Sequence, residues 1–74
     1  MKSLNELTEG KSAIISELKG EGRFLNRIVS IGLTPGCRVE VVQNRKNRPL
    51  LVYSRDTMIA LNHKECKNVY IQEV

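Results

Sequence analysis

The chain has 74 residues, which suits one small domain, and we expect a single unit over residues 1–74. Its 41% hydrophobic and 27% charged residues indicate a globular rather than a disordered protein, and 12 basic against 8 acidic residues give a net charge of +4. No apolar run reaches the roughly 18 residues that span a bilayer, and no signal peptide opens the chain, so we expect a cytoplasmic protein.

Residues 3–18 predict a short helical turn followed by a strand. Ser3 and Glu6 have the spacing of a capping box, which opens a helical turn, and Gly10 ends this segment. Residues 11–18 then mix aliphatic with polar residues, as in a strand whose two faces are both partly covered.

Residues 24–37 predict a helix, its end and a tight turn. The apolar stripe of the helix consists of Phe24, Ile28 and Ile31, widened by Leu25 and Val29. Gly32 predicts a Schellman-type helix end, because glycine readily takes the left-handed backbone conformation. Pro35 and Gly36 then favour a type II turn, in which proline fixes φ and glycine supplies a positive φ.

Residues 38–73 predict four more strands and a second helical turn. The strands are expected at residues 38–43, 50–54, 57–61 and 68–73. A polar loop at residues 44–48 separates the first two of them, and Arg55 and Asp56 form a short turn between the next two. Asn62 and Glu65 repeat the capping pattern, so a helical turn should begin at Asn62.

The order of these features resembles the FeoA family, small proteins of bacterial ferrous iron uptake, and the related SH3-like domains at the C-termini of iron-dependent repressors. The family pattern begins with leucine and glycine, continues with Arg-x-apolar-x-x-apolar-Gly-Leu-x-Pro-Gly, and ends with several short apolar strands. Its pieces in this chain are Leu4, Leu7 and Gly10, residues 27–36, Val39 and Val41, Pro49 and Leu50, residues 59–61, and Val69 with Ile71. The resemblance therefore spans nearly the whole chain.

The resemblance implies a mainly β fold, a small SH3-like five-stranded barrel with one α-helix inserted after the first strand. Short helical turns are expected near the N-terminus and before the last strand, and the elements predicted from the residues agree with this arrangement. The inward positions of the barrel are expected to be Ile15, Val39, Val41, Val52, Ile59, Leu61, Val69 and Ile71.

We expect no enzymatic activity and no cofactor. The acidic residues are scattered singly along the chain, whereas acid–base catalysis needs carboxylates held together at one site. Gly20 and Gly22 precede the helix without the further glycine or the lysine of a phosphate-binding loop. We therefore assign no catalytic and no cofactor-binding residue.

His63 and Cys66 form the strongest candidate metal pair, because H-x-x-C spacing places both side chains on one face of a helical turn. A metal site needs three or four protein ligands, so Cys37 would have to join them from a distant turn. The alternative is a solvated His63 and two reduced cysteines in the core, with Cys66 at a position where the family usually carries alanine. Although the family is associated with transition metal binding, we assign no metal ligand.

Two groups of polar residues are candidates for partner binding. They are Arg45, Lys46 and Arg48 in the polar loop, and Arg23, Asn26 and Arg27 on the polar face of the helix. Positive charge at either place suits an acidic protein surface or a phosphate group. The alternative for the loop is a solvated, mobile hairpin tip, whereas Arg27 matches a basic position of the family motif.

The resemblance implies a non-enzymatic accessory protein that binds the cytoplasmic part of a FeoB-type membrane transporter, which carries a GTP-binding domain, and so supports or regulates iron(II) transport. Such a protein would lie peripherally at the inner face of the cell membrane. The alternative is a small RNA- or DNA-binding barrel, but the shortage of aromatic residues leads us to expect no nucleic acid partner. A detached repressor domain has no room for a helix-turn-helix. The sequence leaves the oligomeric state open, as well as the choice between regulating nucleotide turnover and assembling the transporter.

Overall fold

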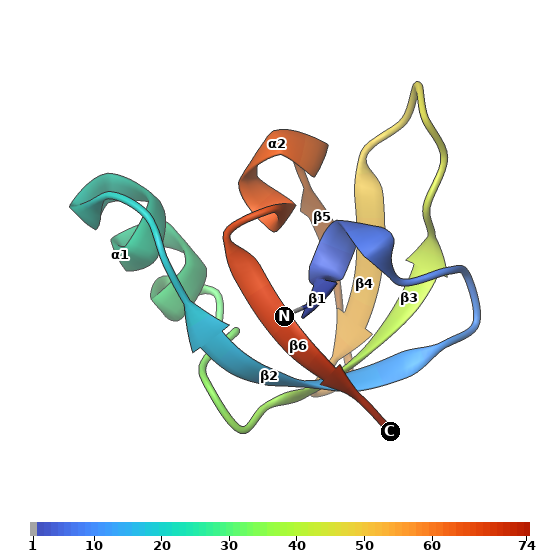
Figure 1. The fold of residues 1–74 in the computed structure, drawn as a ribbon, viewed down its shortest axis with the longest axis horizontal. Helices are drawn as coiled ribbons and strands as arrows, with labels where there is room; N and C mark the ends of the chain where they lie inside the picture. Colours follow the sequence, from blue (N-terminus) through green and yellow to red (C-terminus); the bar gives the residue numbers. More distant parts are fainter. Residues whose placement is uncertain (1) are drawn as a thin grey trace.

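The computed structural model describes residues 2–74, which form one curled antiparallel sheet with three short helical elements (Figure 1). In chain order the elements are β1 (Lys2–Ser3), the 3₁₀ turn η1 (Leu4–Glu6), β2 (Ser12–Leu18), α1 (Gly22–Ser30), β3 (Arg38–Gln43), β4 (Leu50–Ser54), β5 (Thr57–Leu61), α2 (His63–Cys66) and β6 (Val69–Glu73). The strand order across the sheet is β1-β6-β2-β3-β4-β5. The mainly β architecture predicted from the sequence is confirmed, with the two-residue β1 as an additional, sixth strand beside β6.

Two irregularities in strand register accompany the curl of the sheet. The pairing of β2 with β6 shifts between Ile15 and Glu17, and the pairing of β3 with β4 shifts between Val41 and Gln43. Such bulges bend a strand and increase its local twist. The sheet can therefore wrap around its own apolar face, as Figure 1 shows.

The interior of the curled sheet is an aliphatic core. The inward positions predicted from the sequence are all buried, namely Ile15, Val39, Val41, Val52, Ile59, Leu61, Val69 and Ile71. They are joined in the same cluster by Leu4, Leu7, Ala13, Ile28, Leu33, Cys37, Leu50 and Cys66. Both cysteines are thus free, small core residues, as the sequence predicted.

Helix α1 ends in the predicted Schellman arrangement. Gly32 has a φ of +93°, and its N–H donates to the carbonyl of Val29 at 3.0 Å. The N–H of Leu33 donates to the carbonyl of Ile28 at 3.1 Å, and the side chains of Ile28 and Leu33 both belong to the core. The residues that end the helix therefore also anchor it, because Ile28 and Leu33 pack into the core beneath the sheet.

The predicted apolar stripe of α1 is wrong for two of its residues. Ile28 is buried and Phe24 packs against the core, but Val29 and Ile31 are 51% and 40% exposed. Ile31 is the C-cap, where the backbone has already left helical geometry, so helical spacing no longer predicts where its side chain points. The helix therefore contacts the core along one narrow line and leaves apolar surface uncovered.

One tight turn precedes β3, and a second joins β4 to β5. At the first, Gly36 has a φ of +93°, and the N–H of Cys37 donates to the carbonyl of Thr34 at 3.0 Å. The N–H of Gly36 also donates to the carbonyl of Ile15 at 2.7 Å, which ties this turn to β2. At the second, Arg55 and Asp56 have φ values of 52° and 62°, the geometry of a two-residue type I′ hairpin.

The N-terminal segment is held by the capping contacts that the sequence predicted. The carboxylate of Glu6 accepts from the N–H of Ser3 at 2.8 Å and from its hydroxyl at 3.0 Å.

None of the helices within residues 2–74 combines the length and the apolar character that crossing a bilayer requires.

Candidate functional site

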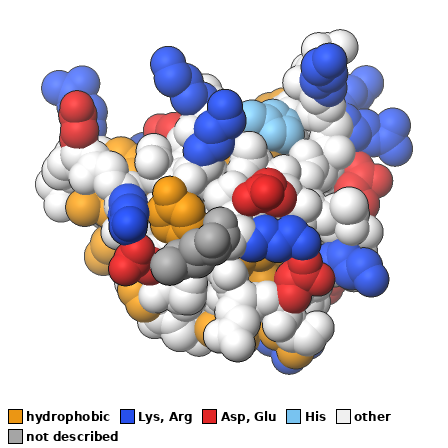
Figure 2. Space-filling model, in the orientation of Figure 1, with side chains coloured by type: hydrophobic (Ala, Val, Ile, Leu, Met, Phe, Trp, Pro, Cys, Tyr) orange, Lys and Arg blue, Asp and Glu red, His pale blue; other side chains and the backbone are white. Residues whose placement is uncertain are grey.

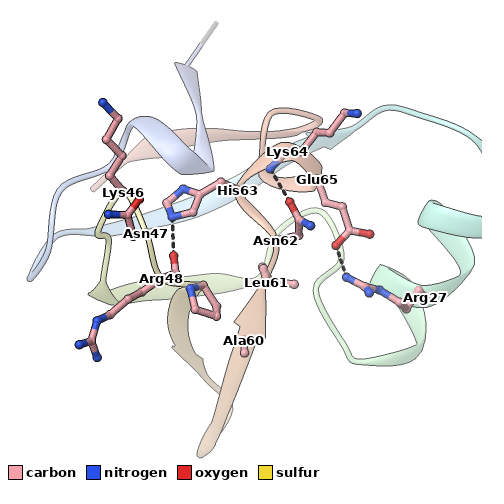
Figure 3. Close-up of a pocket in the computed structure, with 11 residues that line it drawn as sticks. Arg27, Lys46, Asn47, Arg48, Ala60, Leu61, Asn62, His63, Lys64 and Glu65 are labelled. Carbon is pink, nitrogen blue, oxygen red and sulfur yellow. Dashed lines mark hydrogen bonds and ion pairs between the residues drawn. The ribbon is translucent and has the colours of Figure 1, made fainter.

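A solvent-open hollow of about 690 Å³ lies between the loop of residues 44–49, here called the β3–β4 loop, and α2 (Figure 3). Its lining consists of Arg27, Lys46, Asn47, Arg48, Pro49, Ala60, Leu61, Asn62, His63, Lys64 and Glu65. These residues come from α1, from the β3–β4 loop, and from the end of β5 together with α2. Four of them are Lys or Arg and one is Glu, so the lining carries more positive than negative charge.

His63 joins α2 to the β3–β4 loop. Its Nε2 atom lies 2.9 Å from the main-chain oxygen of Arg45 and 2.8 Å from that of Arg48. Both oxygens are acceptors, so Nε2 carries the proton and donates to them. The two ends of the loop segment that carries Lys46 are therefore tied to the first residue of α2.

Asn44 fixes the base of the same loop. Its side-chain Nδ2 donates to the carbonyl oxygens of Asn5 at 3.1 Å and of Leu7 at 2.7 Å. Its main-chain N–H donates to the carboxylate of Glu9 at 2.9 Å. This hydrogen bond, aided by the charge of Arg45, lowers the pKa of Glu9 below its usual value. The loop therefore leaves the sheet from a base held by the N-terminal segment.

Helix α2 presents polar residues to the hollow at its start and buries Cys66 in the core at its end. The side chain of Asn62 caps it by accepting from the N–H of Lys64 at 2.8 Å, as the sequence predicted. At the other end of the turn Cys66 is fully buried in the core. Burial, followed by the negative charge of Glu65, raises the pKa of the Cys66 thiol to about 12, so the thiol is protonated at neutral pH.

An ion pair between Arg27 and Glu65 closes one side of the hollow. The guanidinium of Arg27, on α1, also donates a hydrogen bond to the carboxylate of Glu65, on α2. Figure 3 shows this pair on one side of the hollow, with Lys46 and Arg48 on the loop at the other side. Figure 2 shows several of the basic side chains gathered along one margin of the molecule, next to the histidine. Glu65 offsets part of the charge of Arg27 and leaves Lys46, Arg48 and Lys64 as the main positive charge of the lining.

The structure brings together three of the six residues predicted to bind a partner. Arg27, Lys46 and Arg48 line one hollow, although the sequence placed them in two separate groups. Arg45 instead lies 3.4 Å from the carboxylate of Glu9, outside the lining. Arg23 lines a second hollow of about 460 Å³ beside α1. Asn26 is exposed on α1 and lines neither of these two hollows.

Sequence reasoning missed Lys64 and the structural role of His63. Lys64 lines both hollows, and His63 orients the loop instead of standing free in solvent. The capping pattern at Asn62 showed that both residues open a helical turn. Only the folded chain places that turn against a loop that precedes it by 15 residues or more.

The candidate metal residues lie in different surroundings. The His63 ring faces loop carbonyls, Cys66 is in the core, and the buried Cys37 has its Sγ 3.1 Å from the Ser54 hydroxyl. Within residues 2–74 no three His, Cys, Asp or Glu side chains form a group that could hold a metal ion. The H-x-x-C spacing therefore does not produce a common ligand set here, because one member turns outward and the other inward.

Comparison with known proteins identifies relatives over the whole length of the chain. The FeoA domain family matches residues 2–73. No curated protein sequence is significantly similar. The crystal structure of an iron uptake regulatory protein, FeoA, superposes with a TM-score of 0.93 at 22% sequence identity, covering 99% of this chain and 97% of that one.

Two further solved structures define the fold class. FeoA from Stenotrophomonas maltophilia, in complex with zinc and described as an SH3 domain protein, superposes with a TM-score of 0.80 at 27% identity, covering 97% of this chain and 91% of that one. A manganese-dependent transcriptional repressor matches with a TM-score of 0.91 at 15% identity, and this chain spans 41% of it. The likeness to the repressor concerns the fold alone. The SH3-like fold that the sequence predicted is confirmed.

Proposed function

The chain belongs to the FeoA family, which is associated with ferrous iron transport, and from this we propose that it binds the cytoplasmic part of a FeoB-type membrane transporter. It would act as a non-enzymatic, cytoplasmic accessory protein, a single FeoA unit that meets the membrane through the transporter. The relative from Stenotrophomonas maltophilia, described with a suggested role as a ferrous iron transport activating factor, supports this proposal.

The observation that carries the proposal is the convergence of Arg27, Lys46, Arg48 and Lys64 around one hollow. Their backbones come from separate elements, and His63 fixes the loop that bears two of them. A preordered positive surface suits an acidic surface on a partner protein, since complementary charge orients the partners and speeds their association. We propose this hollow as the contact with the transporter.

The proposed mechanism is contact rather than chemistry. Nε2 of His63 already donates to two carbonyl oxygens, and the Cys66 thiol is protonated and buried. Neither group is therefore presented as a base or a nucleophile toward the hollow. Binding at this surface would alter either the nucleotide cycle of the transporter or the assembly of the transporter. It would do so by contact alone, with no reaction catalysed by this chain.

The positions of the tyrosines favour a protein partner over a single-stranded nucleic acid. Binding of single strands relies on aromatic rings on which bases stack, and no Phe, Tyr or Trp is among the described residues that line the hollow. The His63 ring does line it, but its Nε2 is hydrogen-bonded to loop carbonyls. Tyr53 lies on the outer face of β4, where its hydroxyl donates to Asp56 at 3.1 Å. The ring of Tyr70 is half-buried and lies 5.5 Å from the ammonium group of Lys19.

Titration of the labelled protein with the purified cytosolic region of a FeoB-type transporter tests this proposal. Charge reversal at Arg27, Lys46 or Arg48 should weaken binding by about 1 kcal/mol per site, and more at low salt than at high salt. Arg45→Glu should have a smaller effect, because Arg45 already contacts Glu9. The matched control is Arg38→Glu, which makes the same change of charge at the exposed start of β3, the end of that strand away from the loop.

Two results would count against the proposal. An equal loss of affinity in Arg38→Glu would show that net charge, and not this hollow, determines binding. Titration of the same labelled sample with single-stranded RNA gives the second test. Tight RNA binding with a steep salt dependence, together with no measurable affinity for the transporter region, would favour the nucleic acid alternative.

A further inference from the structure

Strand β5 forms one edge of the described sheet and carries no charged residue. Proteins usually protect such edges with charges, prolines or bulges, because the unpaired N–H and C=O groups of an edge can pair with another strand. The sequence of β5 is Thr-Met-Ile-Ala-Leu, and its register with β4 is regular from Leu50 opposite Leu61 to Ser54 opposite Thr57. This edge therefore lacks the usual protection.

The hairpin geometry determines which main-chain groups lie at the free edge. In a two-residue hairpin the residues that flank the turn, here Ser54 and Thr57, exchange hydrogen bonds with each other. Hydrogen-bonded pairs then alternate along the ladder, so Ile59 and Leu61 also bond to β4. The N–H and C=O groups of Met58 and Ala60 consequently point away from β4, toward the free edge.

The same two residues contribute to an apolar patch on the outer face of the sheet, here called the outer patch. It consists of Leu51, Tyr53, Met58 and Ala60, in which Tyr53 lies opposite Met58 and Leu51 opposite Ala60. Met58 is 53% exposed and Tyr53 is 41% exposed. Apolar side chains that are exposed together at a sheet edge are typical of a protein contact.

We propose that β5 pairs antiparallel with β5 of a second copy of this chain, around a two-fold axis at Ile59. In this register Met58 lies opposite Ala60 of the second copy, and Ala60 lies opposite its Met58. Each of these two pairs exchanges two main-chain hydrogen bonds, which uses all the free groups of both residues. The contact is isologous, as expected for a symmetric dimer.

The occupant is a second copy because the edge is complementary to itself. A large methionine lies opposite a small alanine in both pairs, so this register places no two large side chains directly opposite each other. The row formed by Tyr53 and Met58 continues into Ala60 and Leu51 of the second copy, so the two outer patches become one apolar surface. The pairing would therefore combine main-chain hydrogen bonds with apolar contact.

Salt should affect this contact and the proposed transporter contact in opposite directions. The strand itself is uncharged, while each copy carries a net charge of +4, so only longer-range repulsion opposes the pairing. Ala60 also lines the basic hollow, so the hollow of each copy would lie close to the contact. The positive charges of the two hollows would add to that repulsion. Screening by salt should strengthen the pairing, whereas it should weaken binding of an acidic partner. The inference does not depend on the proposed function.

Sedimentation velocity and amide hydrogen exchange over a range of protein concentrations test the pairing. The amides of Met58 and Ala60 should exchange quickly in dilute solution and at least about tenfold more slowly once dimers form. The amide of Ile59 donates to β4 and should show no such dependence, which makes it an internal control. A protein that stays monomeric at millimolar concentration, or unchanged exchange at Met58 and Ala60, would overturn the proposal.

A matched pair of lysine variants locates the contact. Met58→Lys should raise the dissociation constant of the dimer at least about tenfold, because lysine on an edge disfavours strand pairing. Val29→Lys makes the same chemical change at a residue of α1 that is 51% exposed, against 53% for Met58, and should leave the dimer unchanged. Loss of the dimer in Val29→Lys but not in Met58→Lys would assign the contact to α1 and refute the β5 register.

Discussion

The Nε2 atom of His63 lies 2.8 Å from the main-chain oxygen of Arg48, so the first residue of α2 holds the end of the β3–β4 loop. The same nitrogen lies 2.9 Å from the oxygen of Arg45. One ring therefore bridges the two ends of the segment that contains Lys46. The arrangement of the basic hollow depends on this contact between elements that are 15 to 18 residues apart.

Replacing His63 by alanine should loosen the β3–β4 loop. The oxygens of Arg45 and Arg48 would lose their shared donor, which should cost about 1 kcal/mol of unfolding free energy for this exposed contact. Limited trypsin digestion should cut after Lys46 several times faster in the variant. Lys64→Ala, next along α2, serves as the control, and equal cleavage rates in the wild type and His63→Ala would show that the ring does not restrain the loop.

Gly32→Val should lower the unfolding free energy by about 1–2 kcal/mol, because Gly32 has a φ of +93° that β-branched side chains resist. A Cβ atom at Gly32 would meet nothing within 4 Å, so the cost comes from the backbone and not from a clash. Gly32→Asn should cost less, since asparagine tolerates left-handed geometry.

Gly22→Ala is the matched control for this series. A Cβ atom at Gly22 would also meet nothing within 4 Å, but Gly22 lies in helical geometry at the start of α1. Alanine there should be neutral or stabilise the protein by up to about 1 kcal/mol. Thermal melts of the three variants would contradict the assigned helix end if Gly32→Val and Gly22→Ala behaved alike.

Stability should fall in acid below about pH 4.5. Hydrogen bonds from Ser3 lower the pKa of Glu6, and the N–H of Asn44 lowers that of Glu9, both from an ordinary value of 4.5. A lowered folded-state pKa means that the stabilisation is complete above the unfolded value and is lost as the pH falls through the folded one. Glu9→Gln should flatten this part of the pH profile, because it removes one of the carboxylates whose pKa is lowered by folding. A profile of unchanged shape in Glu9→Gln would contradict this assignment.

Exhaustive chelation should leave the circular dichroism spectrum and the melting temperature unchanged. The core contains both cysteines as packing residues, and burial raises the pKa of Cys66 to about 12, so the thiol is poorly suited to binding a metal at neutral pH. Alkylation of Cys66 should accordingly be slow in the native protein and fast after unfolding. A folded signal that disappears with chelator and returns with zinc or iron would reveal a structural metal site that involves these residues.

Features that depend on neighbours along the chain could be predicted from the sequence. Gly32 ends α1 because the Schellman hydrogen bonds join residues that are three and five positions apart. The inward strand positions, such as Val39 and Val41, followed from the two-residue period of a strand. The turn at Gly36 and the cap at Asn62 followed from the conformations and side-chain acceptors of single residues.

Contacts between distant residues depend on the tertiary fold and could not be predicted in this way. Arg27 pairs with Glu65 across 38 positions, and the curl of the sheet with its two register shifts brings that pair, the loop cations and His63 around one hollow. These contacts depend on strand register and on β-bulges, and neither can be predicted from the spacing of residues along the sequence. The exposure of Val29 had the same origin, because helical periodicity marks an apolar face but does not say how much of it the sheet will cover.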